Sequence, residues 1–416
     1  MKAATRALAY ASTDQKNDAL AHMASAILAN QDQILAANKR DLEQAAQHNL
    51  DQAFVDRLTL SPDRVRAMTN AIHEVIALPD PVGEIDHAWL RPNGLKVAKQ
   101  RIPLGAIGII YESRPNVTSD AAALCIKSGN GVILKGGSAA FHSNLAIYEA
   151  MREGLAQSSL PKKAQGALGF VRTTEREAVK HMLTLSQHID LIIPRGGHSL
   201  ISFVTEHSRI PVIKHDRGVC HTVIEGSAIA EQVDRIVLNA KTQRPGVCNA
   251  METLLVLENA VQPHLGRVLQ ALADAGVKLH LCPVSMEVAT TELNLNEQMI
   301  QDADSDSYAT EFLALELAVR VVKDLDEAID HIETYGSDHS EALLSQDWHL
   351  IQRFQREVNS SVVLINASSR FSDGNQLGLG AEIGISTSRM HAYGPMGLRE
   401  LTTTKFVVQG EGQIRE

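Results

Sequence analysis

One cysteine of this sequence lies in a setting suited to covalent chemistry. Cys248 belongs to the segment NAKTQRPGVCNAMETLLV (239–256), directly after a proline-glycine turn, and Lys241 and Arg244 come just before it. A nucleophilic thiol needs a cation that lowers its pKa and backbone N–H groups that can stabilise an oxyanion. The segment favours a nucleophilic thiol, and from these residues alone a buried structural cysteine remains the other interpretation.

The other three cysteines lie in apolar segments that predict buried, structural thiols. Cys125 falls within an apolar helical pattern, Cys220 enters a β-branched strand, and Cys282 precedes a proline at a strand end. The four cysteines form no CxxC pair, which in a long chain indicates free thiols in a reducing compartment. No His/Cys cluster has the spacing of metal ligands, so we expect no metal.

Two glycine pairs follow expected strands and open expected helices. The turns are Lys135-Gly136-Gly137-Ser138 and Arg195-Gly196-Gly197-His198. Small residues and free N–H groups at the start of a helix favour phosphate binding. Ordinary tight turns between a strand and a helix have the same composition, and neither G-x-G-x-x-G after a strand nor a Walker A motif occurs.

Alternating strands and helices would position these residues. The expected strands are short β-branched runs at 105–111, 131–135, 165–170, 189–194 and 211–214, then near 253–257, 319–322 and 361–366. Helical patterns such as 119–129 and 138–157 lie between them. Continuously apolar strands that alternate with helices imply parallel sheets covered on both faces. The sequence therefore predicts an α/β fold with two doubly wound, Rossmann-like units in tandem.

The segments before these units have a different character. The first 80 residues are almost wholly helical in pattern, and a helix over 61–78 should begin with Ser61 as its cap and Pro62 in its first turn. Residues 87–105 alternate around Pro92-Asn93-Gly94, which is typical of a hairpin.

Composition limits the possible partners. The 416 residues carry a net charge of −10, and no Lys/Arg run dominates any stretch, which argues against nucleic acid or an anionic membrane as the main partner. Aromatic residues make up 4%, too few for a base-stacking platform. No apolar run approaches the ~18–20 residues of a membrane span, and we expect a cytoplasmic protein.

Several longer segments resemble known enzymes. The order RIPLGAIGIIYESRPNVTSDAAALCIKSGNGVILKGG, NAKTQRPGVCNAMETLLV and SSVVLINASSRF resembles the aldehyde dehydrogenase superfamily over most of the chain. The segments HDRGVCHTVIE, NAKTQRPGVCNAMET and GLGAEIGISTSRMHAYGPMGLRELTT resemble more closely the gamma-glutamyl phosphate reductase family. The resemblance implies an enzyme that reduces L-glutamyl 5-phosphate to L-glutamate 5-semialdehyde and phosphate with NADPH, through a cysteine thioester, in proline biosynthesis.

The resemblance also implies roles for single residues. Cys248 matches the nucleophile, and Asn116 matches the asparagine whose amide supports the oxyanion, although a turn asparagine can simply cap a helix. Lys135 matches a lysine that contacts the adenosine ribose, although lysines at strand ends are usually solvated. Glu311 lies where the family has a glutamate for the nicotinamide ribose, but the residues around it depart from the family's pattern.

Two departures from the wider superfamily refine these expectations. Hydrolytic members carry a general-base glutamate where this chain has PVIKHDRGVC (211–220), in which His215 or Asp216 is nearest. The absence of that base fits an acyl phosphate substrate, because activated water would hydrolyse the thioester. His215 stays open as an alternative base.

The second departure concerns the cofactor. NAD-preferring members often have a glutamate at the position of Ser138. The small hydroxyl of Ser138 favours NADPH, with Lys135 and Arg195 as counter-charges for its 2′-phosphate.

The substrate implied by the resemblance carries two anionic groups and an ammonium group. Candidate residues for its anions are Arg114, Lys241, Arg244 and Arg389. Two other functions remain open: a hydrolytic dehydrogenase that oxidises a free aldehyde, and a catalytically silent scaffold or binding protein.

The resemblance further implies a division into domains. Residues 1–85 and 104–225 would form a cofactor-binding domain and 226–395 a catalytic domain, while 86–103 and 396–416 would form a small oligomerisation flap. Exposed edges of such a flap need a partner strand, so we expect a homodimer or a tetramer. Channelling with glutamate 5-kinase is a further possible association.

Overall fold

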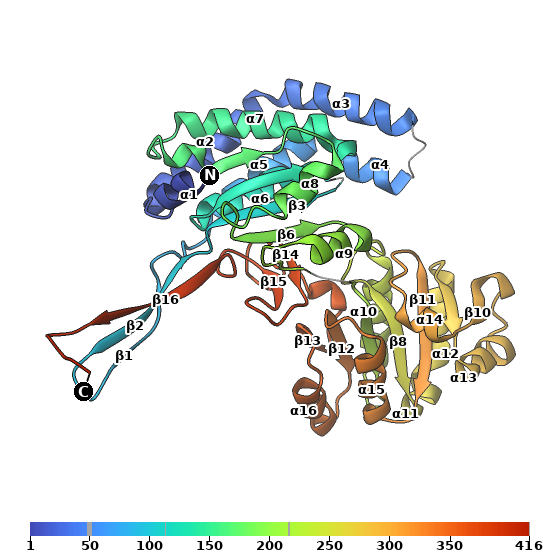
Figure 1. Ribbon diagram of the computed structural model, residues 1–416. Coiled ribbons are helices and arrows are strands. Elements are labelled where there is room, and N and C mark those ends of the chain that lie inside the picture. The colour runs from blue at the N-terminus through green and yellow to red at the C-terminus, as the bar shows by residue number, and fades with distance from the viewer. Residues whose placement is uncertain (48–51, 113, 215–216, 416) are drawn as a thin grey trace.

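The chain forms two lobes and a projecting arm (Figure 1). The structure is a computed structural model that describes residues 1–47, 52–112, 114–214 and 217–415. Each lobe is built around a parallel sheet, and the arm is a three-stranded antiparallel sheet. Within the described residues, no helix is both long and apolar enough to cross a membrane.

The N-terminal region is helical in its described residues, as predicted. Its helices are α1 (Lys2–Leu8), α2 (Thr13–Ala29), α3 (Gln31–Gln47), α4 (Gln52–Leu58) and α5 (Pro62–Ala77). The predicted start of α5 is confirmed, because the Ser61 side chain accepts a hydrogen bond from the Arg64 N–H and Pro62 occupies the first turn. These helices cover one face of the first sheet (Figure 1).

The first lobe contains a four-stranded sheet in the order β5-β4-β3-β6. Its strands are β3 (Ala106–Tyr111), β4 (Gly131–Gly136), β5 (Leu168–Phe170) and β6 (Leu191–Arg195), and its helices are α6 (Asn116–Lys127), α7 (Phe141–Gln157), α8 (Arg176–Met182) and α9 (His198–His207). All three pairings are parallel. Ile107 and Ile109 of β3 pack into the core that includes the N-terminal helices, whereas Ile110 packs on the opposite face with Met182 and Val204. Apolar side chains on both faces explain the continuously apolar strand sequence.

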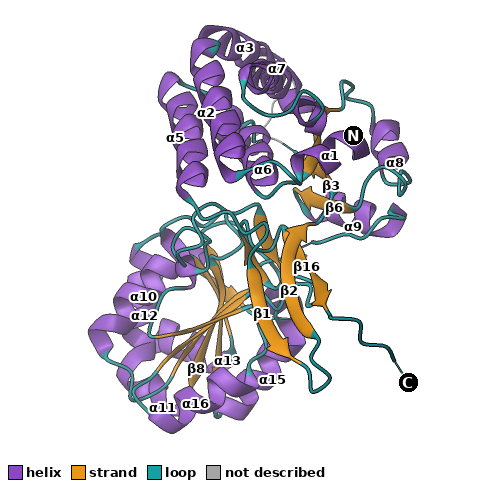
Figure 2. Cartoon of the chain, turned by 90° about the vertical axis from the view of Figure 1, so that its left-hand side faces the viewer, coloured by secondary structure: helices purple, strands orange, loops and turns teal. Residues whose placement is uncertain are grey.

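The second lobe contains a seven-stranded sheet in the order β10-β9-β11-β8-β7-β12-β13, with every pairing parallel. Its strands are β7 (Cys220–Ile224), β8 (Met251–Leu257), β9 (Lys278–Leu281), β10 (Ile300–Asp302), β11 (Glu316–Val322), β12 (Ser340–Leu344) and β13 (Val362–Ile365). Helices cover both of its faces (Figure 2). The longer ones are α10 (Ala230–Thr242), α12 (Gly266–Asp274), α15 (Leu325–Tyr335) and α16 (Trp348–Glu357), and the shorter ones are α11 (Glu258–Ala260), α13 (Pro283–Glu287) and α14 (Ser305–Ala309). The predicted α/β class with two parallel sheets is confirmed.

The pairing of the strands corrects two of the predictions, the strand at 211–214 and the end of the cofactor domain. The expected strand at 211–214 contributes only an isolated bridge between Val212 and Ile192. Strand β7 pairs with β8 and β12 of the seven-stranded sheet, although the predicted cofactor domain extends to residue 225. The strand therefore belongs to the second sheet, and the other predicted boundaries remain a prediction.

The projecting arm is formed by segments far apart in the sequence. Its strands are β1 (Ile85–Leu90), β2 (Lys96–Pro103) and β16 (Thr402–Gln409), with β2 in the centre. The hairpin between β1 and β2 confirms the predicted turn, and Gly94 adopts a positive φ of 85° there. A separate two-stranded sheet, β14 (Gly384–Ser386) with β15 (Gly394–Met396), lies near the junction of arm and lobes (Figure 1).

Candidate active site

The candidate residues come from opposite ends of the two parallel sheets. Asn116, Ser138 and Arg195 lie at or after the carboxyl ends of β3, β4 and β6. Cys248 and Glu311 precede β8 and β11, at the amino edge of the second sheet. Contacts and electrostatic interactions between these two groups place the candidate site where the two edges face each other.

The backbone of Cys248 is held closely by the segment before β7. A Cβ atom on Gly218 would lie 2.0 Å from the Cys248 carbonyl oxygen, so only glycine fits at this approach. The Cys220 thiol donates a hydrogen bond to the same carbonyl, with 3.2 Å between sulfur and oxygen. The Gly218 N–H donates to a carboxylate oxygen of Glu311 at 3.0 Å. Cys248, Gly218 and Glu311 therefore form one connected unit, in which the nucleophile candidate cannot move independently.

Cys248 is half-buried as a residue, whereas Cys125, Cys220 and Cys282 are buried, as predicted for structural cysteines. Burial of the sulfur raises the pKa of Cys248 to about 11 against the opposing charge of Arg195, and the charges of Glu311 and Glu382 contribute to this rise. The sequence predicted a lowered pKa through the cations nearest in sequence. That expectation is wrong for the free protein, because desolvation outweighs the one opposing guanidinium.

Asn116 is the first residue of α6 and is exposed. Its amide nitrogen donates to the Asp120 carboxylate at 2.8 Å, one helical turn along. Burial raises the pKa of Asp120 to about 6, and hydrogen bonds from Asn116 and Ser119 and the charge of Arg195 oppose this rise. The Arg195 guanidinium thus acts on both the Cys248 thiol and the carboxylate that holds Asn116. One hydrogen of the Asn116 amide group remains for a further acceptor.

Several arginines converge on this region. Arg57, Arg114 and Arg244 line a cavity of about 360 Å³ together with Asn116 and Asp120. Burial lowers the pKa of Arg114, and the charges of Arg244, Arg195 and Arg57 lower it further. Within the described residues, no carboxylate lies within ion-pair distance of these four guanidinium groups. Arginine keeps its proton in proteins, so the cluster carries uncompensated positive charge, which an anionic ligand would neutralise.

Lys241 was predicted to bind a substrate anion, and the structure corrects this. Its side chain is fully buried, and its ammonium nitrogen lies 2.5 Å from a Glu252 carboxylate oxygen that is equally buried. Burial lowers the pKa of Lys241 and raises that of Glu252 to about 7. Lys241 is therefore a structural cation below the Cys248 loop and does not reach the cavity.

Two other predicted contacts remain predictions. Arg389 lies at the same edge of the second sheet but is 60% exposed, and its guanidinium is 3.7 Å from Asp338 and stacks on Tyr393. Its contact with a substrate therefore stays a prediction. His215, which stayed open as a base, and its neighbour Asp216 lie outside the described residues.

The two glycine pairs lie at the carboxyl ends of β4 and β6, on either side of β3. Crevices at this edge of an open parallel sheet, where the chain connections change direction, are the usual position of dinucleotides. A Cβ on Gly137 would lie 3.0 Å from the Glu112 carbonyl oxygen, and one on Gly196 would lie 2.5 Å from the Glu112 carboxyl carbon. Glycine at both positions makes room for Glu112, and the two turns with Glu112 between them form a cradle at the edge where a dinucleotide is expected.

Three groups around the cradle have contacts other than those expected from the sequence. The Gly197 N–H, expected to be free for phosphate, donates to the Glu112 carboxylate at 3.0 Å. The Lys135 ammonium is buried and donates to the Gly136 carbonyl at 2.8 Å, while Ser138 is exposed. The Arg195 guanidinium lies beside Gly384, 2.7 Å from where a Cβ of that glycine would stand, and its charge lowers the pKa of Cys248. Its predicted contact with a cofactor phosphate stays a prediction.

Four residues of the site were missed in the sequence. Asp120 could have been found, because it lies four residues after Asn116 on one face of a helix. Gly218 and Glu382 lie within segments that resemble the reductase family, but no local pattern indicated their contacts. Arg57 had no local indication, because only the tertiary structure brings α4 to the cavity.

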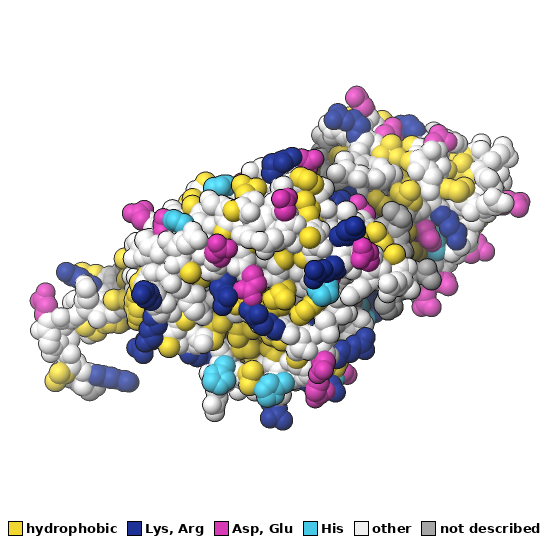
Figure 3. All heavy atoms as spheres, turned by 90° about the horizontal axis from the view of Figure 1, so that it is seen from above, with side chains coloured by type: hydrophobic (Ala, Val, Ile, Leu, Met, Phe, Trp, Pro, Cys, Tyr) yellow, Lys and Arg dark blue, Asp and Glu magenta, His cyan; other side chains and the backbone are white. Residues whose placement is uncertain are grey.

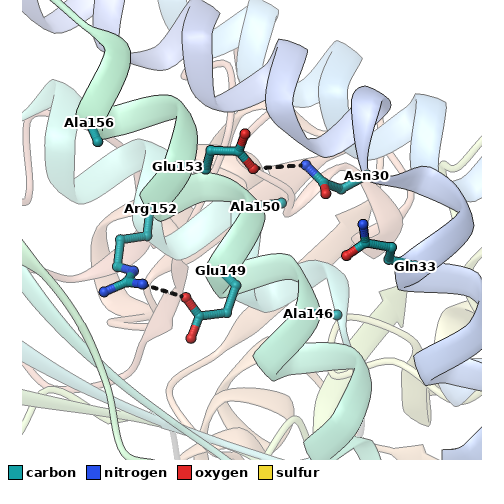
Figure 4. Close-up of a pocket in the computed structure, with 8 residues that line it drawn as sticks. All are labelled: Asn30, Gln33, Ala146, Glu149, Ala150, Arg152, Glu153 and Ala156. Carbon is teal, nitrogen blue, oxygen red and sulfur yellow. Dashed lines mark hydrogen bonds and ion pairs between the residues drawn. The ribbon is translucent and has the colours of Figure 1, made fainter.

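Two other parts of the surface show no comparable group of charged residues without partners within the described residues. A groove between α7 and the junction of α2 and α3 is lined by Asn30, Glu149, Arg152 and Glu153, whose polar groups pair with one another (Figure 4). On the face shown in Figure 3, basic and acidic side chains are interspersed rather than gathered into a patch of one sign. None of the described residues forms a His/Cys/Asp/Glu group suited to a metal ion.

Comparison with known proteins adds relatives that extend over the whole chain. The gamma-glutamyl phosphate reductase of Geobacter metallireducens is 52% identical over 410 residues, which cover 99% of this chain and 96% of the relative. The crystal structure of gamma-glutamyl phosphate reductase from Thermotoga maritima has a TM-score of 0.95 at 43% identity, covering 100% of this chain and 98% of the other. The chain belongs to the gamma-glutamyl phosphate reductase family. No protein-family model matches it.

Membership of the gamma-glutamyl phosphate reductase family makes the chain an oxidoreductase and confirms the predicted family and enzyme class. The fold is that of the aldehyde dehydrogenases. An acetylating aldehyde dehydrogenase from Geobacillus thermoglucosidasius has a TM-score of 0.69 at 15% identity, covering 100% of this chain and 96% of the other.

The pKa of Cys248 leads to a prediction for this reductase-family thiol. Alkylation of Cys248 by iodoacetamide should accelerate about tenfold per pH unit from pH 8 to 10, because the thiolate is the reactive form and the pKa is near 11. Arg195→Gln removes the cation that lowers this pKa, and should slow alkylation at pH 9 by about two- to tenfold. Mass spectrometry of the labelled peptide measures both rates.

The matched control is Arg389→Gln, which removes an arginine at the same sheet edge that has Asp338 and Tyr393 as partners. We expect its alkylation rate to equal that of the parent. A rate that levels off below pH 9, or equal rates for the parent and Arg195→Gln, would contradict this description of the thiol.

Proposed function

We propose that the chain reduces L-glutamyl 5-phosphate to L-glutamate 5-semialdehyde and inorganic phosphate, with NADPH as reductant, as a step of proline biosynthesis. The observation that carries this proposal is a cluster of arginines beside the half-buried Cys248 that have no acidic partner at ion-pair distance within the described residues. Such a cluster suits a ligand with two anionic groups, as this acyl phosphate has. The names of the full-length relatives agree with this substrate.

In the proposed first stage, the Cys248 sulfur bonds to the acyl carbon and the carbon–oxygen bond to phosphate breaks. The proton of the thiol leaves with the phosphate, so that hydrogen phosphate and an enzyme thioester remain. Because the pKa of Cys248 is raised in the free protein, the thiol is protonated at neutral pH, and its proton passes to the leaving phosphate as the sulfur bonds to the acyl carbon. A thioester accepts hydride far more readily than a carboxylate, which is the advantage of a covalent route.

The tetrahedral oxyanion needs donors that are already oriented before reaction. The Asn116 amide group is held by Asp120 through one of its hydrogens, and the other can donate to the oxyanion together with the Cys248 N–H. A donor of this kind contributes roughly 3–4 kcal/mol to transition-state stabilisation. Arg195 offsets the negative charge of Asp120 beside this position.

The cofactor would lie in the cradle at the carboxyl edge of the first sheet. Residues expected to hold it are Lys135, Gly136, Ser138, Arg195, Gly196, Gly197 and Glu311. When bound, a reduced nicotinamide supplies hydride to the thioester carbon. Glu311, connected to the Cys248 backbone through Gly218, would orient the nicotinamide ribose relative to the sulfur. The thiol re-forms as the aldehyde leaves and takes up one proton.

The decisive experiment runs the reaction in reverse. Purified protein with glutamate 5-semialdehyde and NADP⁺ should form NADPH only when inorganic phosphate is present, because phosphate must release the acyl group from Cys248. Cys248→Ser should abolish this activity while the affinity for NADPH, measured by fluorescence titration, stays within about twofold. NADPH formation that does not depend on phosphate would instead indicate a hydrolytic dehydrogenase, and full activity of Cys248→Ser would exclude the thioester.

Ser138 provides a test of cofactor preference. Ser138→Glu places a carboxylate where the 2′-phosphate of NADPH would lie, and should lower kcat/KM for NADPH at least tenfold relative to NADH by charge repulsion. Ser138→Gln, of similar size but neutral, is the control and should change the ratio much less. Equal ratios in all three proteins would place the 2′-phosphate elsewhere.

We also propose that the arm mediates self-association, as a dimer or tetramer. Its edge strands β1 and β16 have unpaired edges and expose Ile85, Leu90, Phe406 and Val408 by 55–68%, and such edges favour pairing with another chain. Phe406→Lys should therefore lower the mass measured by light scattering towards that of a single chain. Tyr10→Lys, at an even more exposed aromatic residue outside the arm, should not. An unchanged mass for Phe406→Lys would assign assembly to another surface.

A further inference from the structure

The geometry points to Asp120 as the residue that recognises the ammonium group of the substrate and thereby selects an amino acid derivative over a simple acyl phosphate. This inference rests on the proposed function, because it names the partner of one group of that substrate. The charges of the cavity motivate it. Arginines alone would accept any small dianion, whereas selection for an amino acid needs one carboxylate among them.

Four carboxylates lie near the thiol or the cavity and could play this role, of which two lie outside the cavity lining. Glu311 accepts the Gly218 N–H at 3.0 Å, and Glu382 accepts the Gly374 N–H at 2.8 Å. Both acids are tied to loop backbone, and neither is among the residues that line the cavity of Asn116 and the arginines. Their positions do not suit direct contact with a ligand bound there.

The cavity itself has two acidic residues in its lining, Asp56 and Asp120. Asp56 is exposed and forms an ion pair with Arg64 at 2.8 Å. Asp120 accepts hydrogen bonds from the Asn116 amide and the Ser119 hydroxyl, and within the described residues it has no cation at ion-pair distance. A carboxylate can accept about four hydrogen bonds, so Asp120 retains capacity for a charged donor.

The spacing of the two side chains suits the substrate. The Asn116 amide nitrogen lies 2.8 Å from an Asp120 carboxylate oxygen, and a hydrogen bond of about 2.9 Å from each of them to a ligand can span two ligand groups about 5 Å apart. The acyl carbon and the α-nitrogen of an extended glutamyl chain are about 5 Å apart, given bond lengths near 1.5 Å. A substrate whose carbonyl oxygen lies at Asn116 can therefore place its ammonium group at Asp120. The arginines Arg57, Arg114 and Arg244 would then face its anionic groups.

Burial strengthens this interaction. Desolvation raises the pKa of Asp120 to about 6, so at neutral pH the group is ionised but poorly compensated. An ammonium group supplies the missing charge, and a hydrogen bond between two charged groups is roughly twice as strong as one between neutral groups. Binding of the ammonium group would thus offset the cost of keeping the Asp120 carboxylate ionised away from water, which the free protein bears.

The test compares two aldehydes in the reverse reaction with phosphate and NADP⁺: glutamate 5-semialdehyde, and 5-oxopentanoate, which has the same chain without the amino group. Asp120→Asn keeps the size and an acceptor for the Asn116 amide but removes the charge. It should lower kcat/KM for the semialdehyde roughly 10- to 100-fold, mainly through KM, and leave 5-oxopentanoate within about threefold. Asp120→Glu, which retains the charge, should keep the preference for the amino aldehyde.

Two matched variants separate recognition from positioning. Asn116→Ala should lower kcat for both aldehydes alike, by about 10²–10³-fold, because it removes the oxyanion donor. Asp56→Asn removes the other acid of the cavity and should leave the ratio between the aldehydes unchanged. If Asp120→Asn lowers activity on both aldehydes equally, or on neither, the inference is overturned and Asp120 only orients Asn116. A parent protein inactive with the semialdehyde and phosphate would overturn the proposed function itself.

Discussion

The parallel direction of every strand in the two central sheets is the constraint on which the active site depends. Parallel strands present all their carboxyl ends at one edge of a sheet and all their amino ends at the other. Asn116 and Arg195 lie at the carboxyl edge of the four-stranded sheet, whereas Cys248 and Glu311 lie at the amino edge of the seven-stranded sheet. Neither sheet holds a complete set of reactive groups. The site exists only where the two edges face each other.

Close backbone contact fixes the Cys248 loop at the amino edge of the seven-stranded sheet. Gly218 approaches the Cys248 carbonyl so closely that no side chain fits between them, and the buried Cys220 thiol bonds to the same oxygen. Below the loop, the buried pair of Lys241 and Glu252 removes a cation that sequence proximity had suggested for the substrate. Removing one partner of such a pair is costly, since it leaves an uncompensated charge in the interior. These residues therefore serve the nucleophile indirectly, through the position of its backbone.

In the free protein, the arginines of the cavity carry positive charge that an anionic substrate would neutralise. Burial raises the pKa of the Cys248 thiol, and the guanidinium groups of Arg57, Arg114 and Arg244 have no acidic partners among the described residues. A doubly anionic substrate would neutralise the arginines. In the proposed mechanism, the thiol is protonated in the free protein and gives up its proton only as the phosphate of that substrate leaves. This arrangement would protect the sulfur from wasteful reactions between turnovers.

Local sequence patterns determined the elements whose stabilising interactions are local. The Ser61-Pro62 start of α5, the Gly94 hairpin and the apolar strand β3 follow from capping, turn geometry and burial on two faces. Strand β12 was missed, because its sequence contains a glutamate that is buried only through a partner on another strand. The Glu341 carboxylate lies 3.0 Å from the His221 ring nitrogen of β7, and both side chains are fully buried.

The same distinction holds for the site. Cys248 and Asn116 could be named from the sequence, because their turns and the segments around them resemble a known family. Sequence proximity misassigned Lys241, since it does not tell which way a helical side chain points. Arg57 and the pKa of Cys248 were decided by tertiary structure alone, because charges and desolvation depend on which distant segments meet. The sequence thus determined which groups are present, and the packing of two sheet edges decided which of them act together.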